Sequence, residues 1–262
     1  MHYKNNKSDN SASACQDALT TNNARRRMRQ QLLRMGWTKH KCPYPVNGTL
    51  NLMARYRSPH IYNNCFWFEN CLKKLNPKGE VYYALEMRCA DLEHLTWRCD
   101  LENPNNRHPL DTLDAFYVLR RYMLEGLPWD YGTGRKEDRG IIKIIDWEHP
   151  ENNTFEFVEK WQGAINDGFG WDFILLVNAI PLCGIVVEDT LQAAYDMAQY
   201  QLDNDYQFPV YCHLLVISDG NSMMVGDPWM EFDKFTAIGT LKEALRPVDF
   251  LINRIKTIPE YF

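Results

Sequence analysis

The stretch that decides the fold is IIKIIDWEHPENNTFEFVEKWQGAINDGFGWDFILLVNAIPLCGIVVED, residues 141–189. Near its end, two apolar runs, FILLV at 173–177 and CGIVV at 183–187, flank a link of Asn, Ala, Ile, Pro and Leu. Runs of this length that are rich in Ile and Val favour buried strands over helices. The stretch therefore predicts two buried neighbouring strands. Asp172 stands at the head of the first strand, and Glu188 follows the apolar run of the second.

Other strands and helices alternate around this pair. Strands are expected at 141–147, 155–161 and 210–217, with a hairpin partner at 222–228. Helices are expected at 24–37, 60–79, 109–129 and 190–206, whereas 81–97 is compatible with helix or strand. This order predicts an α/β (α+β) domain with a mixed central β-sheet flanked by helices. We expect a disordered polar tail at 1–23 and one domain over 24–262, divided into a helical part (24–129), a sheet core (141–228) and a C-terminal helical segment (240–262).

The charge balance places a limit on nucleic-acid binding. The 262-residue chain has a net charge of −5, so any contact with DNA must use a local positive patch. The densest positive cluster lies on the helix expected at 24–37, where Met28, Leu32, Leu33 and Met35 are expected to form the apolar side. Its candidate DNA-binding residues are Arg25, Arg26, Arg27 and Arg29. The cluster is either a solvated helix face or a set of phosphate contacts.

The eight cysteines give no sign of a metal or disulfide framework. They are scattered without a C-x-x-C pair, which argues against a zinc ribbon. The N-terminal residues contain no apolar core of the kind that a signal peptide has. No run approaches the roughly 20 apolar residues of a membrane span. We therefore expect a cytoplasmic protein with reduced thiols and no membrane contact.

Five segments in series resemble one known family. They are ENCLKKLNP (69–77), IIKIIDWEHPENNTFEFVEKW (141–161), WDFILLVNAIPLCGIVVED (171–189), HLLVISDGNSMMVGD (213–227) and FDKFTAIGT (232–240). Their order and spacing resemble the amino-terminal nuclease domain of type I restriction endonuclease R (HsdR) subunits. The resemblance implies a restriction-endonuclease-like fold of the PD-(D/E)xK superfamily. It covers most of residues 60–262, and it implies much less about activity than about fold.

The resemblance breaks at the catalytic residues. In that family, the Asp heading the first strand and the Glu of a Glu-x-Lys motif hold a divalent metal, while the Lys orients or activates the attacking water. The Asp carries over to Asp172, the Glu to Val186 and the Lys to Glu188. Valine offers no oxygen to Mg²⁺, and glutamate reverses the charge that lysine would bring. The pattern therefore predicts a pseudo-nuclease.

Two interpretations of the remaining acids stay open. Asp172 and Glu188 can together hold Mg²⁺ with a backbone carbonyl and waters, which would make the chain a metal-dependent endodeoxyribonuclease. Alternatively, Glu188 and Asp189 form a solvated strand end, and a nearby donor satisfies Asp172. Lys143 and Lys160 are the candidates to replace the missing lysine.

Three functional hypotheses follow from these residues. The first is a catalytically inactive component that binds DNA or protein subunits of a restriction or phage-defence system. The second is an active Mg²⁺-dependent endonuclease with a rearranged site. The third is an anti-restriction decoy of the R subunit, which the small net charge disfavours. The family continues into a helicase motor where this sequence ends, and no phosphate-binding loop is present, so we expect a freestanding domain that uses no ATP.

Overall fold

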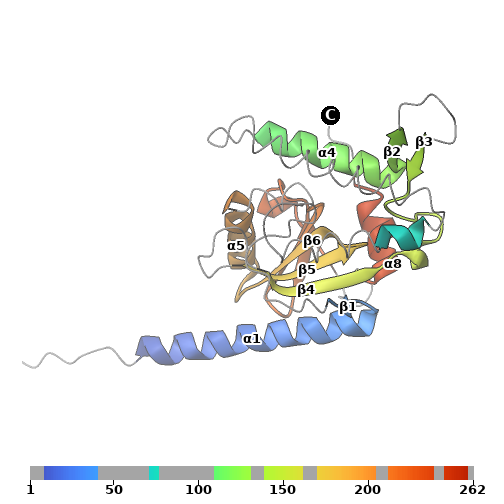
Figure 1. Cartoon of the computed structure of the whole chain (residues 1–262). Coiled ribbons are helices and arrows are strands. Elements are labelled where there is room, and N and C mark those ends of the chain that lie inside the picture. The colour runs from blue at the N-terminus through green and yellow to red at the C-terminus, as the bar shows by residue number, and fades with distance from the viewer. Residues whose placement is uncertain are drawn as a thin grey trace, which may run out of the picture.

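A mixed seven-stranded sheet forms the centre of the molecule (Figure 1). The computed structural model describes residues 9–40, 71–76, 109–130, 139–161, 170–204, 212–238 and 245–258. The strands of the sheet, in spatial order, are β1 (Thr38–Lys39), β4 (Phe155–Trp161), β5 (Trp171–Val177), β6 (Ile180–Val187), β7 (Leu214–Ser218), β8 (Met223–Gly226) and β9 (Thr236–Ala237). The predicted α/β class with a mixed central sheet is confirmed.

The two apolar runs of the deciding stretch form the middle of this sheet. β4, β5 and β6 are successive antiparallel neighbours, and β6 then pairs in parallel with β7. All eight residues of β6 are buried. Strands covered on both faces are expected to be apolar throughout rather than alternating, and helices lie on both sides of the sheet (Figure 1). The predicted strands at 155–161, 172–177 and 183–188 are therefore confirmed.

The helices frame the sheet. Within the described residues they are α1 (Asp9–Met35), a turn of helix at 71–75, α4 (Pro109–Glu125), α5 (Leu191–Asn204) and α8 (Pro247–Phe250), which continues as a π-helical turn at Leu251–Ile255. Short 3-10 turns occupy Pro150–Asn152 and Phe232–Lys234. α5 packs on β6 and β7, as predicted. Within the ranges given above, no helix is both long enough and apolar enough to cross a membrane.

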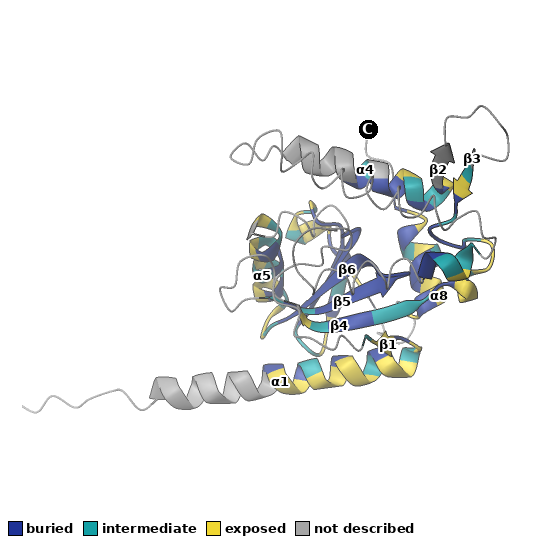
Figure 2. Ribbon diagram, in the orientation of Figure 1, coloured by how far each residue is buried: buried dark blue, intermediate teal, exposed yellow. Residues whose placement is uncertain are grey.

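Helix α1 runs along one side of the sheet. It begins at Asp9, so helix covers part of the 1–23 segment for which composition predicted disorder. It ends before Gly36, whose φ of 105° suits glycine at a helix end. Figure 2 shows its sheet-facing residues buried and its outer residues exposed. Met28 and Leu32 are buried as predicted, but the prediction for Leu33 is wrong, because its position on the helix leaves it 48% exposed.

The expected strand at 141–147 does not join the central sheet, and that prediction is wrong. β3 (Arg139–Ile142) pairs instead with β2 (Leu127–Asp130) in a separate two-stranded sheet. The backbone leaves the strand at Lys143 because the side-chain amide of Asn76 forms hydrogen bonds with both the N–H and the carbonyl of Lys143. The N–H of Lys143 donates to Asn76 Oδ1, and its carbonyl accepts from Asn76 Nδ2, each at 2.8 Å.

A buried polar network stabilises the loops beside the β5–β6 turn. Asn178 has a φ of 51° in this turn and is fully buried. Its side chain accepts from the N–H of Thr154 at 2.7 Å and donates to the carbonyl of Ile144 at 2.8 Å. Asn153 connects this network to Asp146 by accepting the N–H of Asp146 and donating to its carbonyl. The network joins the β5–β6 turn to the loop before β4.

Candidate functional site

The acid that heads β5 lies opposite the valine that replaces the family glutamate. Phe173 pairs with Ile185 in the antiparallel β5–β6 ladder, so one further step places Asp172 opposite Val186. Directly opposed residues of an antiparallel pair share a face of the sheet. Val186 is 1% exposed and also pairs with Ile217 of β7. The position expected to carry a metal-binding carboxylate is therefore adjacent to Asp172, and it is hydrocarbon.

Glu188 lies at the same edge but outside the strand. β6 ends at Val187, and the N–H of Glu188 donates to the carbonyl of Ser218 at 3.0 Å. Its side chain is 27% exposed, compared with 11% for Asp172. The chain turns toward α5 after Val187, so Glu188 is not part of the strand that carries Val186.

A guanidinium group from α1 joins the two acids. Arg25 Nε lies 2.5 Å from Asp172 Oδ1, and Arg25 Nη2 lies 3.3 Å from Glu188 Oε1. The same Nη2 donates to the carbonyl of Val187 at 3.2 Å. The second carboxylate oxygen of Asp172 accepts the N–H of Val187 at 2.8 Å. Both oxygens of Asp172 are therefore engaged by groups of the protein.

The two acids influence each other across this contact. Burial raises the pKa of Asp172, and this effect is opposed by Arg25 and by the hydrogen bond from Val187. Burial also raises the pKa of Glu188, where Arg25 lowers it while Asp172 and Asp189 raise it further. Like charges held close together disfavour ionisation of both groups. One arginine thus partly compensates two carboxylates that burial and proximity make harder to ionise.

The two lysines considered as replacements lie in different places. Lys143 Nζ is 3.3 Å from Asp146 Oδ1, so this lysine pairs with the buried polar network. Lys160 lies within β4 with a φ of 53°, between the register pairs that place Glu159 opposite Phe173 and Trp161 opposite Trp171. This position is across from Asp172, and the charge of Lys160 lowers the pKa of that acid. Of the two, Lys160 is the lysine at the site.

The residues present do not fit a divalent metal. Within the described parts of the chain, no three His, Cys, Asp or Glu side chains gather closely enough to hold one. Mg²⁺ requires several hard oxygen ligands in near-octahedral geometry. Val186 supplies none, and Arg25 brings a positive charge to the oxygen of Asp172 that a metal would use. The acids Asp172 and Glu188 are thus arranged as partners of an arginine.

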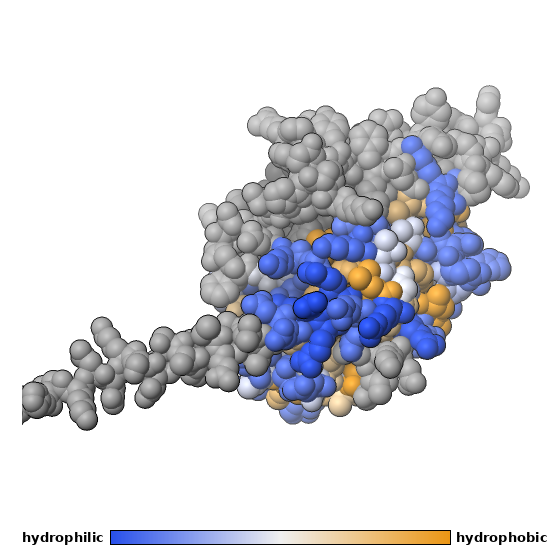
Figure 3. All heavy atoms as spheres, turned by 90° about the horizontal axis from the view of Figure 1, so that it is seen from below, coloured by the Kyte–Doolittle hydropathy of each residue, from blue (hydrophilic) through white to orange (hydrophobic). Residues whose placement is uncertain are grey.

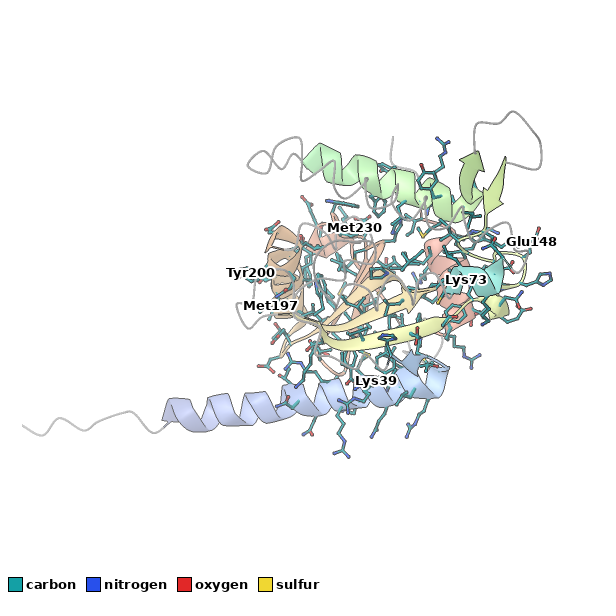
Figure 4. The ribbon with its side chains drawn as sticks, viewed as in Figure 1. Lys39, Lys73, Glu148, Met197, Tyr200 and Met230 are labelled. Carbon is teal, nitrogen blue, oxygen red and sulfur yellow. The ribbon has the colours of Figure 1, made fainter. Side chains whose placement is uncertain are left out.

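The remaining predicted DNA-contacting arginines divide into two groups. Arg29 Nε pairs with a carboxylate oxygen of Glu159, whose other oxygen lies 2.5 Å from Lys39 Nζ. Figure 4 shows Lys39 between the end of α1 and β4. Arg26 and Arg27 are exposed. The side of the molecule on which α1 lies has a mostly hydrophilic outer surface, with some hydrophobic patches (Figure 3).

Sequence reasoning missed the docking of α1 against the acids. Thr21 Oγ1 donates to Asp189, and Arg25 and Arg29 pair with acids of the sheet. The signal was present in the spacing. Positions 25, 28, 29 and 32 recur at helical intervals and share one face, and that face includes the buried Met28 and Leu32. Arginines on the apolar side of a helix indicate acidic partners in the element it covers.

Two comparisons with known proteins found similar sequences. The family model described as type I restriction enzyme R protein N terminus (HSDR_N) matches residues 20–232. The chain belongs to this family. The HSDR_N match contains the β5–β6 hairpin as well as Arg25. The chain is also 28% identical over 131 residues to the type I restriction enzyme HindI endonuclease subunit of Haemophilus influenzae. That alignment covers 47% of this chain and 12% of the relative, so the chain spans a small part of the relative's length.

Proposed function

We propose that this HSDR_N chain is a nuclease-fold domain without nuclease activity. It acts as a DNA- or protein-binding component of a restriction or phage-defence system. The observation that carries the proposal is the side chain of Val186, buried opposite Asp172 where the family resemblance implies a metal-binding glutamate. Hydrolysis of a phosphodiester at such a site needs a metal that generates hydroxide and neutralises developing charge. Neither Val186 nor Arg25 supports such a metal.

The charge at the third family position supports the same proposal. The resemblance implies a lysine that orients or activates water near the phosphate, and Glu188 stands in its place. A carboxylate there repels the phosphate that a lysine would attract. Lys160 lies across from Asp172, on β4 rather than on β6. The positive charge of Lys160 does not by itself replace the two acids, the lysine and the metal that the family resemblance implies.

The test is a cleavage assay on supercoiled plasmid. Purified protein is incubated with plasmid in Mg²⁺ and, separately, in Mn²⁺, and nicked and linear products are measured over time. We expect the plasmid to remain supercoiled, as it does with a matched Asp172→Ala variant. Cleavage by the natural sequence that disappears in Asp172→Ala would establish the rearranged active site, in which Asp172 and Glu188 bind the metal together, and would overturn the proposal.

The binding role rests on exposed arginines of α1. Arg26 and Arg27 are both exposed. Arg25 and Arg29 pair with acids of the chain, which removes them from the set best suited to contact phosphates. Phosphate contacts dominate the affinity of most DNA-binding surfaces. We therefore expect DNA to be held by Arg26 and Arg27, and a partner subunit becomes the favoured ligand if DNA binding fails.

A further inference from the structure

The contact between α1 and the edge of the sheet is built around one cation and two carboxylates. Arg25 approaches Asp172 Oδ1 at 2.5 Å and Glu188 Oε1 at 3.3 Å, from a side chain that is 33% exposed. Charged pairs at fully exposed positions contribute little, but the Asp172 side chain is only 11% exposed. Taking away a partner of a buried charge leaves that charge uncompensated, which is strongly unfavourable. Asp172 therefore requires a cation nearby.

The position of Arg25 is fixed by the contacts on both sides of it along the helix. Thr21, one turn before Arg25, donates to Asp189. Ala24 packs so closely on Gly220 of the β7–β8 turn that a Cβ built on the glycine would lie 2.5 Å from the Ala24 Cβ. Met28 and Leu32, on the following turns, are buried. The guanidinium thus comes from a docked helix and is held in its position by packing.

The location of this cation coincides with the place where the family resemblance implies a metal. Asp172 is the acid carried over from the family, and Val186 beside it marks the missing ligand. A guanidinium differs from a metal ion in needing only hydrogen-bond acceptors, and it tolerates a hydrocarbon neighbour. Arg25 can therefore occupy this place although Val186 offers no carboxylate, because a guanidinium does not need the ligand that valine lacks.

We propose that Arg25 is a built-in cation that replaces a divalent metal between Asp172 and Glu188 and docks α1 across that site. This inference rests on the proposed absence of nuclease activity and adds a cause for it. The domain folds without metal because its acid pair is already compensated. Removing the positive charge at position 25 leaves Asp172 and Glu188 without their shared cation, so that the two carboxylates, with the Val187 carbonyl and waters, become open to a divalent ion.

The first test compares Arg25→Gln with Arg26→Gln, which removes the same charge from an exposed neighbouring position. Thermal unfolding is measured in EDTA and in about 10 mM Mn²⁺, Mg²⁺ or Ca²⁺. In EDTA we expect Arg25→Gln to lower the Tm by about 3–6 °C, while Arg26→Gln leaves it nearly unchanged. We expect Mn²⁺ to raise the Tm of Arg25→Gln by at least about 2 °C and to leave the natural protein unaffected. Adding Asp172→Asn to Arg25→Gln should abolish the response to metal.

Two outcomes would overturn the inference while leaving the proposed lack of nuclease activity intact. One is a Tm of Arg25→Gln equal to that of Arg26→Gln, with no response to Mn²⁺. The other is a Mn²⁺ response in the natural protein that Asp172→Asn removes, which would show that metal enters beside Arg25. Plasmid cleavage by the natural sequence would instead refute the proposed function itself.

A second set of variants keeps the inference testable if Arg25→Gln does not fold. The acids are neutralised together as Asp172→Asn with Glu188→Gln, first with Arg25 present and then with Arg25→Met. If the three groups form one unit, neutralising the acids alone leaves the guanidinium without a negative partner, and the added Arg25→Met restores at least half of the lost Tm. Additive losses across the three changes would mean that the groups act independently and would refute the inference.

Discussion

The side-chain amide of Asn178 donates a hydrogen bond of 2.7 Å to Oδ1 of Asn153, and this contact joins the β5–β6 turn to the loop before β4. Both residues are buried. The same oxygen of Asn153 accepts the N–H of Asp146 at 2.9 Å. The β5–β6 turn is thus connected to a polar loop that precedes both strands.

Replacing Asn178 by alanine should destabilise the fold strongly. The change removes the partners of the Thr154 N–H, the Ile144 carbonyl and the Asn153 side chain. It also places alanine at a φ of 51°. Buried groups left without partners cost about 1–3 kcal/mol each, so we expect a loss of about 3 kcal/mol or more in urea unfolding. Asn221→Ala, in an exposed turn, is the matched control and should cost less than about 0.5 kcal/mol. A similar small loss in both variants would contradict the role of the network.

Gly220 is predicted to control the docking of α1. It has a φ of 84°, and an added Cβ would lie 2.5 Å from the Cβ of Ala24. Gly220→Ala therefore combines backbone strain with a steric clash, and we expect a loss of about 2–4 kcal/mol in unfolding free energy. Gly36→Ala is the control for strain alone, because its φ is 105° and an added Cβ would lie 3.8 Å from Cγ of Pro247, which is an ordinary contact distance.

A compensating change at Ala24 separates the effect of the steric clash from the effect of backbone strain at Gly220. Ala24→Gly removes the methyl group that the new side chain would meet. We expect the double variant Ala24→Gly with Gly220→Ala to recover part of the stability that Gly220→Ala loses, even though glycine is unfavourable within a helix by about 1 kcal/mol. Urea unfolding of the four proteins measures this recovery. Strictly additive losses would mean that α1 does not rest on the β7–β8 turn.

The local pattern of apolar residues was sufficient to predict the strands that lie in the middle of the sheet. The apolar runs at 173–177 and 183–187 form buried strands because helices cover both faces, and no other structure satisfies such runs at this length. The helix at 191–204 follows from its own periodicity. The juxtaposition of Asp172 with Val186 did not follow from the tight turn alone, because the β5–β6 ladder shifts its register by one residue between Leu175 and Leu176.

Local pattern failed where a distant side chain decides the outcome. The chain at 141–147 has a strand-like pattern, yet the backbone of Lys143 is paired with the side chain of Asn76, 67 residues away. The helix at 24–35 was predictable, but its docking onto Asp172 was not, because Arg25 pairs across 147 positions that no periodicity spans. Arginines on the buried side of the helix were the available signal.

Asp146 should make the stability depend on acid pH. Burial by itself raises its pKa, but hydrogen bonds from Asn152, from the His149 N–H and from Lys143 together lower the pKa below its usual value. A carboxyl whose folded pKa is depressed contributes stability that is present above its unfolded pKa of about 3.9 and is lost as pH falls through the folded pKa. We expect Asp146→Asn to be less stable than the natural protein at pH 7, with the difference narrowing below about pH 4. Urea unfolding at a series of pH values measures this difference, and a constant difference would contradict the prediction.

The exposed arginines of α1 should determine any affinity for DNA. Each phosphate that a protein neutralises contributes about −0.9 to the slope of log affinity against log salt for duplex DNA. Arg26, Arg27 and Arg29 are all exposed, but Arg29 also pairs with Glu159. Replacing Arg26 and Arg27 together by glutamine should therefore weaken binding and flatten the slope by about 2, while Arg29→Gln should change it by less than about 1. Fluorescence anisotropy with a labelled duplex across a salt series measures these slopes. Absence of binding at low salt, or equal effects of all three arginines, would refute phosphate contact by the outer face of α1 and would favour a protein partner.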